Sequence, residues 1–564
     1  MVPLRDLAKF LLSLLSLLVL QGLLAAQATP QASTPDPNAN SPQLHFHSRA
    51  TLIQLPVLVK QKSGQHLSGL TRTNFRVFED GVEQPIASFE EVRVSDHLVP
   101  ASAPTPGEYT NIRADVPQMM TVIAVDMANT PHNDQIYARA QLVRYLAGRL
   151  SPNQRIALVS ISTRGLGIIH DVDSDPQALI RALQRADAGI PATQAATSPE
   201  TAPVLSSQNE FNPARSITAA SLDQRVEQFM QAADAQEARN ESDRSIETTL
   251  RALQSIAWSL SGIPGRKSLI WITDGMPLAR YSTDAAMPGY LESLYHRAIQ
   301  SLNDAQVALY PVDASGLGSK RTSPSSDLVQ LGSLNPLNTL DTLRTSTQTS
   351  MNMLADQTGG RAFYNTNNLE AAFRSVAEDS GSYYLLTYYL VSGHAKPGWR
   401  SLKVSLDQRG VNIRYRTGFY VSQGNDDLDA NRRKDLEFAL ISPFTCTGVP
   451  MTVRWLPAST APGSKAVNFS VHLSAESFSL DPDGNRFNLE FAAIAYKDGR
   501  NAAHVGDSLQ GHLKDATFAK FKAKGLTYED SLSNLGPGEY RVRFVVRDNL
   551  SGRVGSVSAP LVVN

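Results

Sequence analysis

Two aspartates stand directly after runs of apolar residues, where their carboxylates could act as ligands for a divalent cation. Asp126 ends the run TVIAVD, Asp274 follows SLIWIT, and Thr130 adds a hydroxyl close to the first of them. Hard cations such as Mg²⁺ take oxygen ligands from one or two carboxylates, with waters completing the set. The alternative is that each aspartate only forms a turn or caps a helix by accepting backbone N–H groups.

The elements around these aspartates alternate between strands and helices from about residue 121 to 389. TVIAVD and SLIWIT are apolar enough to be strands buried on both faces, and residues 137–150 and 245–262 have helical spacing. This alternation predicts a doubly wound α/β domain with a mostly parallel sheet between helices. Ligands of such sheets bind beyond the carboxyl ends of the strands, which is where both aspartates stand.

Several strings in this region together resemble a von Willebrand factor A domain, namely TVIAVDMANT, SLIWITDG and LADQTGGRAFYNTNNLEAAF. With LSGIPGRKSLIWITDG, YYLLTYYLVSG and FRVFEDGVEQPIASF, the chain is similar to the secreted von Willebrand factor A-related proteins of acidobacteria over residues from about 44 to 421. The resemblance implies a Rossmann-type domain that binds a protein partner. It also implies Mg²⁺ or a similar cation at a metal-ion-dependent adhesion site, with a partner carboxylate completing the coordination.

The resemblance assigns roles to five residues of this chain. Asp126 and Thr130 match the Asp and the second hydroxyl of the family's D-x-S-x-S loop, and Asp274 matches its later aspartate. Thr248 or Thr249 matches the family's loop threonine, and the spacing does not choose between them.

The chain departs from this pattern at Ala128, which offers no oxygen where the first serine is expected. The site is therefore either a weakened cation site, completed by water or by the carbonyl of Asn129, or a scaffold retained without metal. In the first case Ala128→Ser should tighten Mg²⁺ binding and Asp126→Ala should abolish it. In the second case neither the native protein nor Asp126→Ala responds to cations, and Asp126→Ala stabilises the fold by removing repulsion from Asp274.

The first 28 residues have the form of a secretory signal peptide. Arg5 and Lys9 precede a Leu-rich stretch that is shorter than the ~20 residues of a membrane span, and Ala26-Gln27-Ala28 has the small-x-small form of a cleavage site. We expect an exported protein that is periplasmic, on the cell surface or secreted, with no transmembrane segment after cleavage. Cys446 is the only cysteine, so the folds must hold without an internal disulfide.

The rest of the chain divides by composition into linkers and β-rich modules. Short strands around Gly, Pro and Asn turns predict an immunoglobulin- or fibronectin-like β-sandwich near the C-terminus, which we expect to fold alone. Asp80-Gly81 predicts a hairpin turn. The expected boundaries are a flexible linker at 29–43, a β-rich segment at 44–95, the α/β domain at 118–390 with insertions at about 187–215 and 314–338, a β extension at 391–421, a linker at 424–434 and the sandwich at 435–564.

Composition and motifs argue against several functions. The net charge is -1, so no basic surplus favours nucleic acid. The GDSL string that begins at Gly506 resembles a lipase motif, but it stands in a β-rich region without a downstream D-x-x-H. The chain contains no H-E-x-x-H, P-loop or dinucleotide fingerprint. We therefore expect a non-enzymatic, adhesion-type protein-binding protein. The alternatives are a metal-free structural or envelope-assembly scaffold, and a metal-assisted hydrolase that uses Asp126 and Asp274.

Overall fold

The computed structural model describes most of the chain after residue 49. The described residues are 50–93, 105–112, 119–148, 154–188, 217–276, 278, 287–316, 336–366, 368–391, 398–421, 428–457, 466–481 and 485–563. They belong to one compact unit, Ser48–Asn564. The expected signal peptide and first linker lie outside the described residues, as do the middle parts of both expected insertions.

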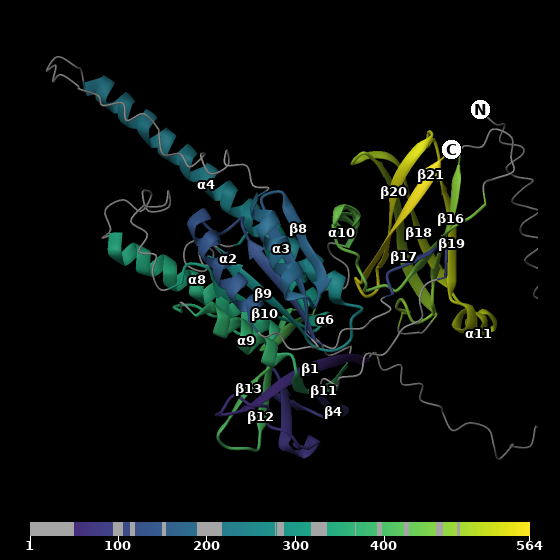
Figure 1. Ribbon diagram of the computed structural model, residues 1–564, viewed down its shortest axis with the longest axis horizontal. Coiled ribbons are helices and arrows are strands. Elements are labelled where there is room, and N and C mark those ends of the chain that lie inside the picture. Colours follow the sequence, from purple (N-terminus) through teal and green to yellow (C-terminus); the bar gives the residue numbers. More distant parts are fainter. Residues whose placement is uncertain are drawn as a thin grey trace, which may run out of the picture. The chain divides into compact units, whose positions relative to one another are not determined.

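A five-stranded sheet forms the centre of the α/β domain (Figure 1). Its order is β10-β9-β6-β7-β8, and every pairing is parallel except that of β8, which runs antiparallel to β7. All residues of β6, β9 and β10 are buried, as the unbroken apolar runs predict. The strands are β6 (Met119–Asp126), β7 (Gln154–Ser162), β8 (Gly165–Asp173), β9 (Lys267–Thr273) and β10 (Val307–Asp313).

Helices cover both faces of this sheet because alternate residues of each strand point to opposite sides. Met120, Val122 and Ala124 of β6 pack in a core with α4 (Ile217–Leu260) and α6 (Gly289–Asp304), and Leu354 of α8 (Pro336–Thr358) joins them. Ile123 and Val125 pack in a second core on the other face. The helices of that face are α2 (His132–Ala147), α3 (Pro176–Ala188) and α9 (Leu369–Asp379).

Two helices begin much earlier than the sequence predicts. The helix expected at 245–262 is α4, which starts at Ile217, and Figure 1 shows its first part extending past the end of the sheet. The part before Ser245 is about 40 Å long at 1.5 Å per residue. Similarly, α8 starts at Pro336, inside the insertion expected to end at 338. The other insertion was expected to begin at 187, and α3 continues into it as far as Ala188. Residues of high helix propensity, mainly Ala, Gln and Glu, explain the extension of α4.

The expected N-terminal β segment and the β extension form one module, which corrects the predicted boundaries. Its two four-stranded sheets have the orders β13-β1-β11-β4 and β14-β12-β2-β3. β11 was expected to belong to the α/β domain, but its alternating Tyr384, Leu386 and Tyr388 pack in the module's core instead. The elements are β1 (Ala50–Gln61), η1 (Arg72–Asn74), β2 (Phe75–Glu79), β3 (Val82–Gln84), β4 (Ser88–Arg93), β11 (Ser382–Val391), β12 (Gly398–Leu406), β13 (Val411–Arg414) and β14 (Gly418–Val421). The hairpin turn is confirmed, with φ of 47° at Asp80 and 84° at Gly81.

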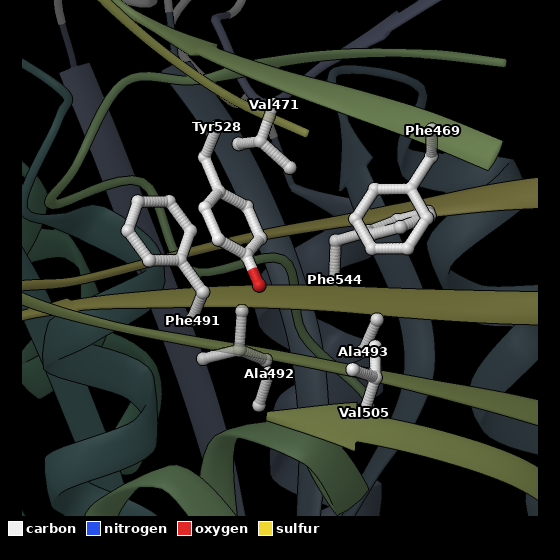
Figure 2. A pocket seen from close by; sticks show the side chains of 9 residues that line it. Phe469, Val471, Phe491, Ala492, Ala493, Val505, Tyr528 and Phe544 are labelled. Atoms are coloured by element: carbon white, nitrogen blue, oxygen red, sulfur yellow. The ribbon is translucent and has the colours of Figure 1, made fainter. Parts of the chain in front are cut away.

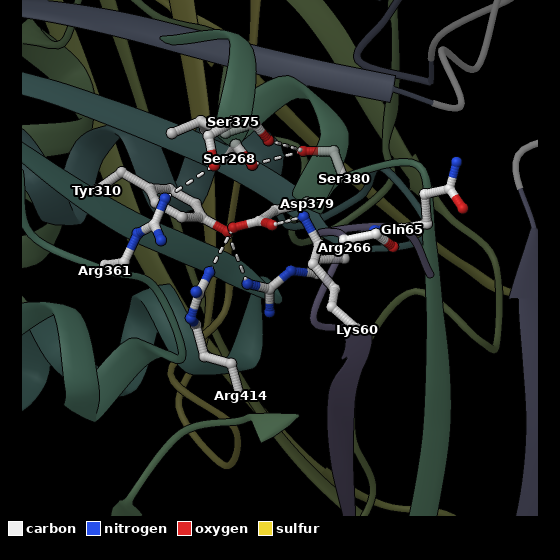
Figure 3. A network of polar contacts seen from close by, with 12 residues as sticks. Lys60, Gln65, Arg266, Ser268, Tyr310, Arg361, Ser375, Asp379, Ser380 and Arg414 are labelled. Atoms are coloured by element: carbon white, nitrogen blue, oxygen red, sulfur yellow. Dashed lines mark hydrogen bonds and ion pairs between the residues drawn. The ribbon is translucent and has the colours of Figure 1, made fainter. Parts of the chain in front are cut away.

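A polar network connects this β module to the α/β domain (Figure 3). The carboxylate of Asp379, at the end of α9, lies 2.5 Å from Lys60 Nζ on β1 and 2.5 Å from Arg414 Nη1 on β13. Nearby, Arg266 donates from Nη2 to the hydroxyl of Tyr310 at 3.0 Å. Because Asp379 is 1% exposed, its two basic partners compensate a charge that water does not reach.

The C-terminal β module consists of two four-stranded antiparallel sheets that share one hydrophobic core. Figure 2 shows aromatic contacts between them: Phe491 of one sheet stacks on Tyr528 of the other at 4.2 Å, and Phe469 meets Phe544 edge to face at 4.9 Å. The orders are β19-β16-β15-β5 and β18-β17-β20-β21. The elements are β5 (Glu108–Thr110), β15 (Thr452–Trp455), β16 (Val467–Leu473), β17 (Arg486–Lys497), β18 (Arg500–His512), α11 (Asp515–Lys524), β19 (Leu526–Leu532), β20 (Gly538–Asp548) and β21 (Val554–Val563).

The boundary expected before Asp435 falls inside a helix. The polar segment read as a linker is largely α10 (Leu428–Ile441). Asp435 on this helix lies 3.1 Å from Arg297 of α6 and 3.1 Å from Arg547 of β20. In addition, β5 precedes the α/β domain in the chain yet pairs with β15. A fragment of residues 435–564 therefore lacks an edge strand and half of α10.

We expect residues 435–564 alone to be less stable than residues 428–564 joined to 105–112 by a Gly-Ser linker. The longer fragment restores the β5–β15 pairing and the whole of α10. Urea unfolding followed by circular dichroism compares the two. A single transition at the same urea concentration for both fragments would show that β5 and the start of α10 contribute nothing to this module.

Candidate functional site

Asp126 lies at the carboxyl end of β6, in the middle of the central sheet. The chain leaves β6 for α2 on one face, whereas it leaves the neighbouring β9 for α6 on the other face. Connections that part to opposite faces leave a crevice at the carboxyl ends of the two strands, and this is the usual ligand position in such sheets. Asp126 stands at this end of β6 with its side chain fully buried.

Five hydrogen-bond donors surround the carboxylate of Asp126. Oδ1 accepts from the backbone N–H groups of Ala128 and Asn129, each at 3.0 Å. Oδ2 accepts from Trp271 Nε1 at 3.0 Å, from Thr273 Oγ1 at 3.1 Å and from Asn129 Nδ2 at 2.8 Å. The donors come from the loop after β6 and from β9, so this carboxylate joins the two central strands at their ends.

Two opposing effects act on the pKa of Asp126. Burial raises the pKa because it disfavours the charged form, while hydrogen bonds from Asn129, Thr273 and Trp271 lower it. The effect of burial is the larger, and the pKa lies above its ordinary value. The loop that supplies the backbone donors is itself fixed, since Met127 N donates to Ile161 O of β7 at 2.7 Å.

The side chain of Asn129 connects Asp126 to α4. Its Nδ2 donates to Asp126 Oδ2 and also to Thr249 Oγ1, both at 2.8 Å. Its Oδ1 accepts a hydrogen bond from Ser245 Oγ, one turn before Thr249 on the same helix. Thr249 is fully buried. An amide NH₂ group therefore lies between the carboxylate of β6 and the hydroxyl of α4.

Thr130 and the loop after β9 complete this edge of the sheet. Thr130 Oγ1 accepts from the backbone N–H of Asp274 at 3.2 Å. Gly275 has φ of 103°, and a Cβ at this position would come within 2.0 Å of Thr347 Cγ2 on α8. The loop thus requires glycine both for its backbone conformation and for the close approach of α8.

The structure brings together Asp126, Thr130, Thr249 and the backbone of Asp274. It also chooses between the two threonines: Thr249 makes the contact, whereas Thr248 is about 100° round the helix and only half-buried. The sequence interpretation missed Trp271 and Thr273 as partners of Asp126. The available signal was the period of two in β9, which places both residues on one face of the strand.

The arrangement provides a direct test of the cation that the resemblance implies. Asp126 Oδ2 and Thr249 Oγ1 are two of the oxygens that would hold it, and the NH₂ group of Asn129 lies within 2.8 Å of each. A donor and a cation compete for the same lone pairs, so the residues as arranged do not fit a divalent ion. We therefore derive no chemistry through a metal.

Other expected site features can also be located. Among the described residues, no three His, Cys, Asp or Glu side chains gather as a metal site, and no helix in this part of the chain is long and apolar enough to cross a membrane. Ser508 of the GDSL string lies exposed on β18, which pairs along its length with β17. A strand position of this kind lacks the sharp strand-to-helix turn of a nucleophilic serine.

No family model and no curated protein matches the chain. Several solved structures match the chain, and two of them are weakly similar to it. The N-terminal domain of TFIIH p34 is 11% identical with a TM-score of 0.19, and the match covers 46% of this chain and 97% of that one. VWA2 of Sulfolobus acidocaldarius, a paralog of ArnB, is 9% identical with a TM-score of 0.19, and the match covers 92% of this chain and 76% of that one.

Proposed function

We propose that the protein is an exported, non-enzymatic binding protein whose α/β domain is of the von Willebrand factor A type. The domain is doubly wound, meets a protein partner at the carboxyl edge of its sheet, and is accompanied by an immunoglobulin-like C-terminal sandwich. The observation that carries this proposal is the divergence of the chain to opposite faces after β6 and β9, with the polar cluster of Asp126, Asn129 and Thr249 at the carboxyl end of β6. The antiparallel edge strand β8 in an otherwise parallel sheet is common in doubly wound folds.

The contacts of Asp126 favour binding over hydrolysis. A general base or a ligand for a catalytic water must reach the reacting group within hydrogen-bond distance. Both oxygens of Asp126 instead face protein donors, and the side chain is fully buried. This carboxylate is placed to hold two strands and a loop together, not to accept a proton from a substrate.

The surface around the crevice suits a protein partner. The helices α2 and α6 follow β6 and β9, so their first turns lie at the carboxyl edge of the sheet. Each presents a large, partly apolar side chain to solvent there: Ile136 is 53% exposed and Tyr290 is 51% exposed. Apolar and aromatic groups within a polar rim are typical of the residues that anchor protein interfaces.

Site-specific photo-crosslinking in cells of the source organism tests this function. A photoreactive phenylalanine analogue at Ile136 or Tyr290 is expected to capture the same partner protein. Val82, 63% exposed on β3, and Tyr389, 53% exposed on β11, are matched control positions on the β module. Equal capture from all four positions, or capture only from the controls, would rule out the carboxyl edge as the binding surface. N-terminal sequencing of the recovered protein tests export, for which residue Thr29 is the expected first residue.

A further inference from the structure

We propose that the side-chain amide of Asn129 takes the place of a divalent cation at the carboxyl edge, and that partner binding there is independent of cations. The structural half concerns Asp126, Asn129 and Thr249 alone. The half that concerns the partner rests on the proposed function.

The side-chain amide of Asn129 is placed to join two oxygens. An NH₂ group has two N–H bonds, and Nδ2 of Asn129 donates to Asp126 Oδ2 and to Thr249 Oγ1, each at 2.8 Å. One small group thereby joins the end of β6 to α4, two elements that are far apart in the sequence. A bound cation would make the same connection with oxygens at about 2.0–2.1 Å for Mg²⁺.

The hydroxyl of Ser245 fixes the orientation of this amide. Ser245 Oγ donates to Asn129 Oδ1, so the carbonyl oxygen of the amide faces Ser245 and the NH₂ group faces the carboxylate of Asp126 and the hydroxyl of Thr249. A flipped amide would place its carbonyl oxygen against Asp126 and leave two acceptors in contact. The backbone N–H of Asn129 also donates to Asp126, at 3.0 Å, and this second contact holds the residue in place.

The negative charge of Asp126 is compensated by hydrogen-bond donors of the protein. A divalent cation would compensate Asp126 with positive charge that a partner's carboxylate could then share. Here the compensation consists of five N–H and O–H dipoles, each already directed at Asp126. An acidic partner residue finds no open coordination position in this arrangement. The partner is therefore held by the surrounding surface at Ile136 and Tyr290 and not by a metal–carboxylate bond.

Thermal unfolding and calorimetric titration of the full chain with Mg²⁺ and Mn²⁺ test the structural half. The native protein should give no binding heat and the same melting temperature in chelator and in cation. Ala128→Ser alone should behave in the same way, because Asn129 still fills the position. Asn129→Asp replaces the donor with a second carboxylate, so it should melt lower in chelator and recover by roughly 5–10 °C at about 100 times the Kd for Mn²⁺.

Two further variants keep this test decisive. Asn240→Asp makes the same chemical change at an exposed amide on α4 and should show no cation response. If Asn129→Asp does not fold, the double variant Ala128→Ser with Asn129→Ala opens the position and restores a hydroxyl, and it should acquire Mn²⁺ binding. Cation-dependent stabilisation of the native protein that is lost in Asp126→Ala would overturn the proposal, as would a lack of Mn²⁺ response in both Asn129 variants.

Photo-crosslinking at Ile136 in chelator and in Mg²⁺ tests the half that concerns the partner. Equal capture in both conditions agrees with the proposal. Capture only in Mg²⁺ would leave the binding surface correct and the cation independence wrong. Absence of capture in both conditions would instead contradict the proposed function, while the thermal measurements would still decide the role of Asn129.

Discussion

Asp126→Ala is expected to lower the free energy of unfolding by about 3–5 kcal/mol, a range typical of removing one partner from a buried charged contact. The substitution leaves donors from Ala128, Asn129, Trp271 and Thr273 without an acceptor in a place that water does not reach. This loss outweighs the gain from removing a buried charge. The result is opposite to the stabilisation expected from the sequence for a metal-free site.

Denaturant unfolding of the native protein and Asp126→Ala measures the difference. Asp171→Ala is a suitable control, because Asp171 is exposed on β8 and accepts only a local hydrogen bond from the backbone of Val172. We expect that control to change the free energy of unfolding by less than about 0.5 kcal/mol. Equal stability of Asp126→Ala and the native protein would show that the hydrogen bonds from these five donors to the carboxylate do not stabilise the fold.

Lys267→Met is expected to stabilise the protein by roughly 3 kcal/mol at pH 6 to 7. Lys267 begins β9 with 2% of its surface exposed, and its Nζ donates to Ile263 O at 2.5 Å. Burial lowers the pKa of this lysine to about 7 from its ordinary 10.5. The unfolded chain therefore holds a proton between these two pH values that the folded protein has lost, and the stability of the native protein rises with pH through this window.

The variant and the native protein should differ most below pH 7, where the folded protein carries a buried charge. The difference should shrink as the pH rises from 7 towards 10.5, because Lys267 is then neutral in the folded protein and removing its proton from the unfolded chain costs progressively less. Unfolding curves at pH 6, 8 and 9.5 measure this convergence. Lys403→Met, a matched change at an exposed lysine of β12, should show a constant difference near zero. A constant gain for Lys267→Met at all three values would show that folding does not change the pKa of this lysine.

The central sheet and the position of Asp126 follow from local patterns in the sequence. TVIAVD and SLIWIT are buried strands, and their carboxyl ends meet at one edge because the strands are parallel neighbours. The hairpin at Asp80-Gly81 was predictable for a similar reason, since few residues accept a positive φ. Each of these features depends on a short run of residues and on backbone rules that distant parts of the chain do not alter.

The features that the sequence did not indicate depend on contacts between distant residues. The alternation in β11 predicts a strand, but not that β1, more than 300 positions earlier, is its partner. The role of Asn129 was missed because a side-chain amide can act as donor or acceptor, and only the positions of Thr249 and Ser245 decide which. In α10 the apolar face that would reveal a helix is short, and Phe438 gains its partner, Trp258, from another domain.

The interleaving of strands along the chain also determines the order in which the protein can be completed during synthesis. β1 to β4 emerge first, but their sheets remain open until β11 to β14 follow, and β5 waits for β15 beyond residue 451. The α/β domain, which lies between these halves, is the first part whose strands are all available. Until β13 and β15 are made, the unpaired edges of β1 and β5 are exposed to pairing with other chains, so a chaperone that shields extended segments would act on these two strands.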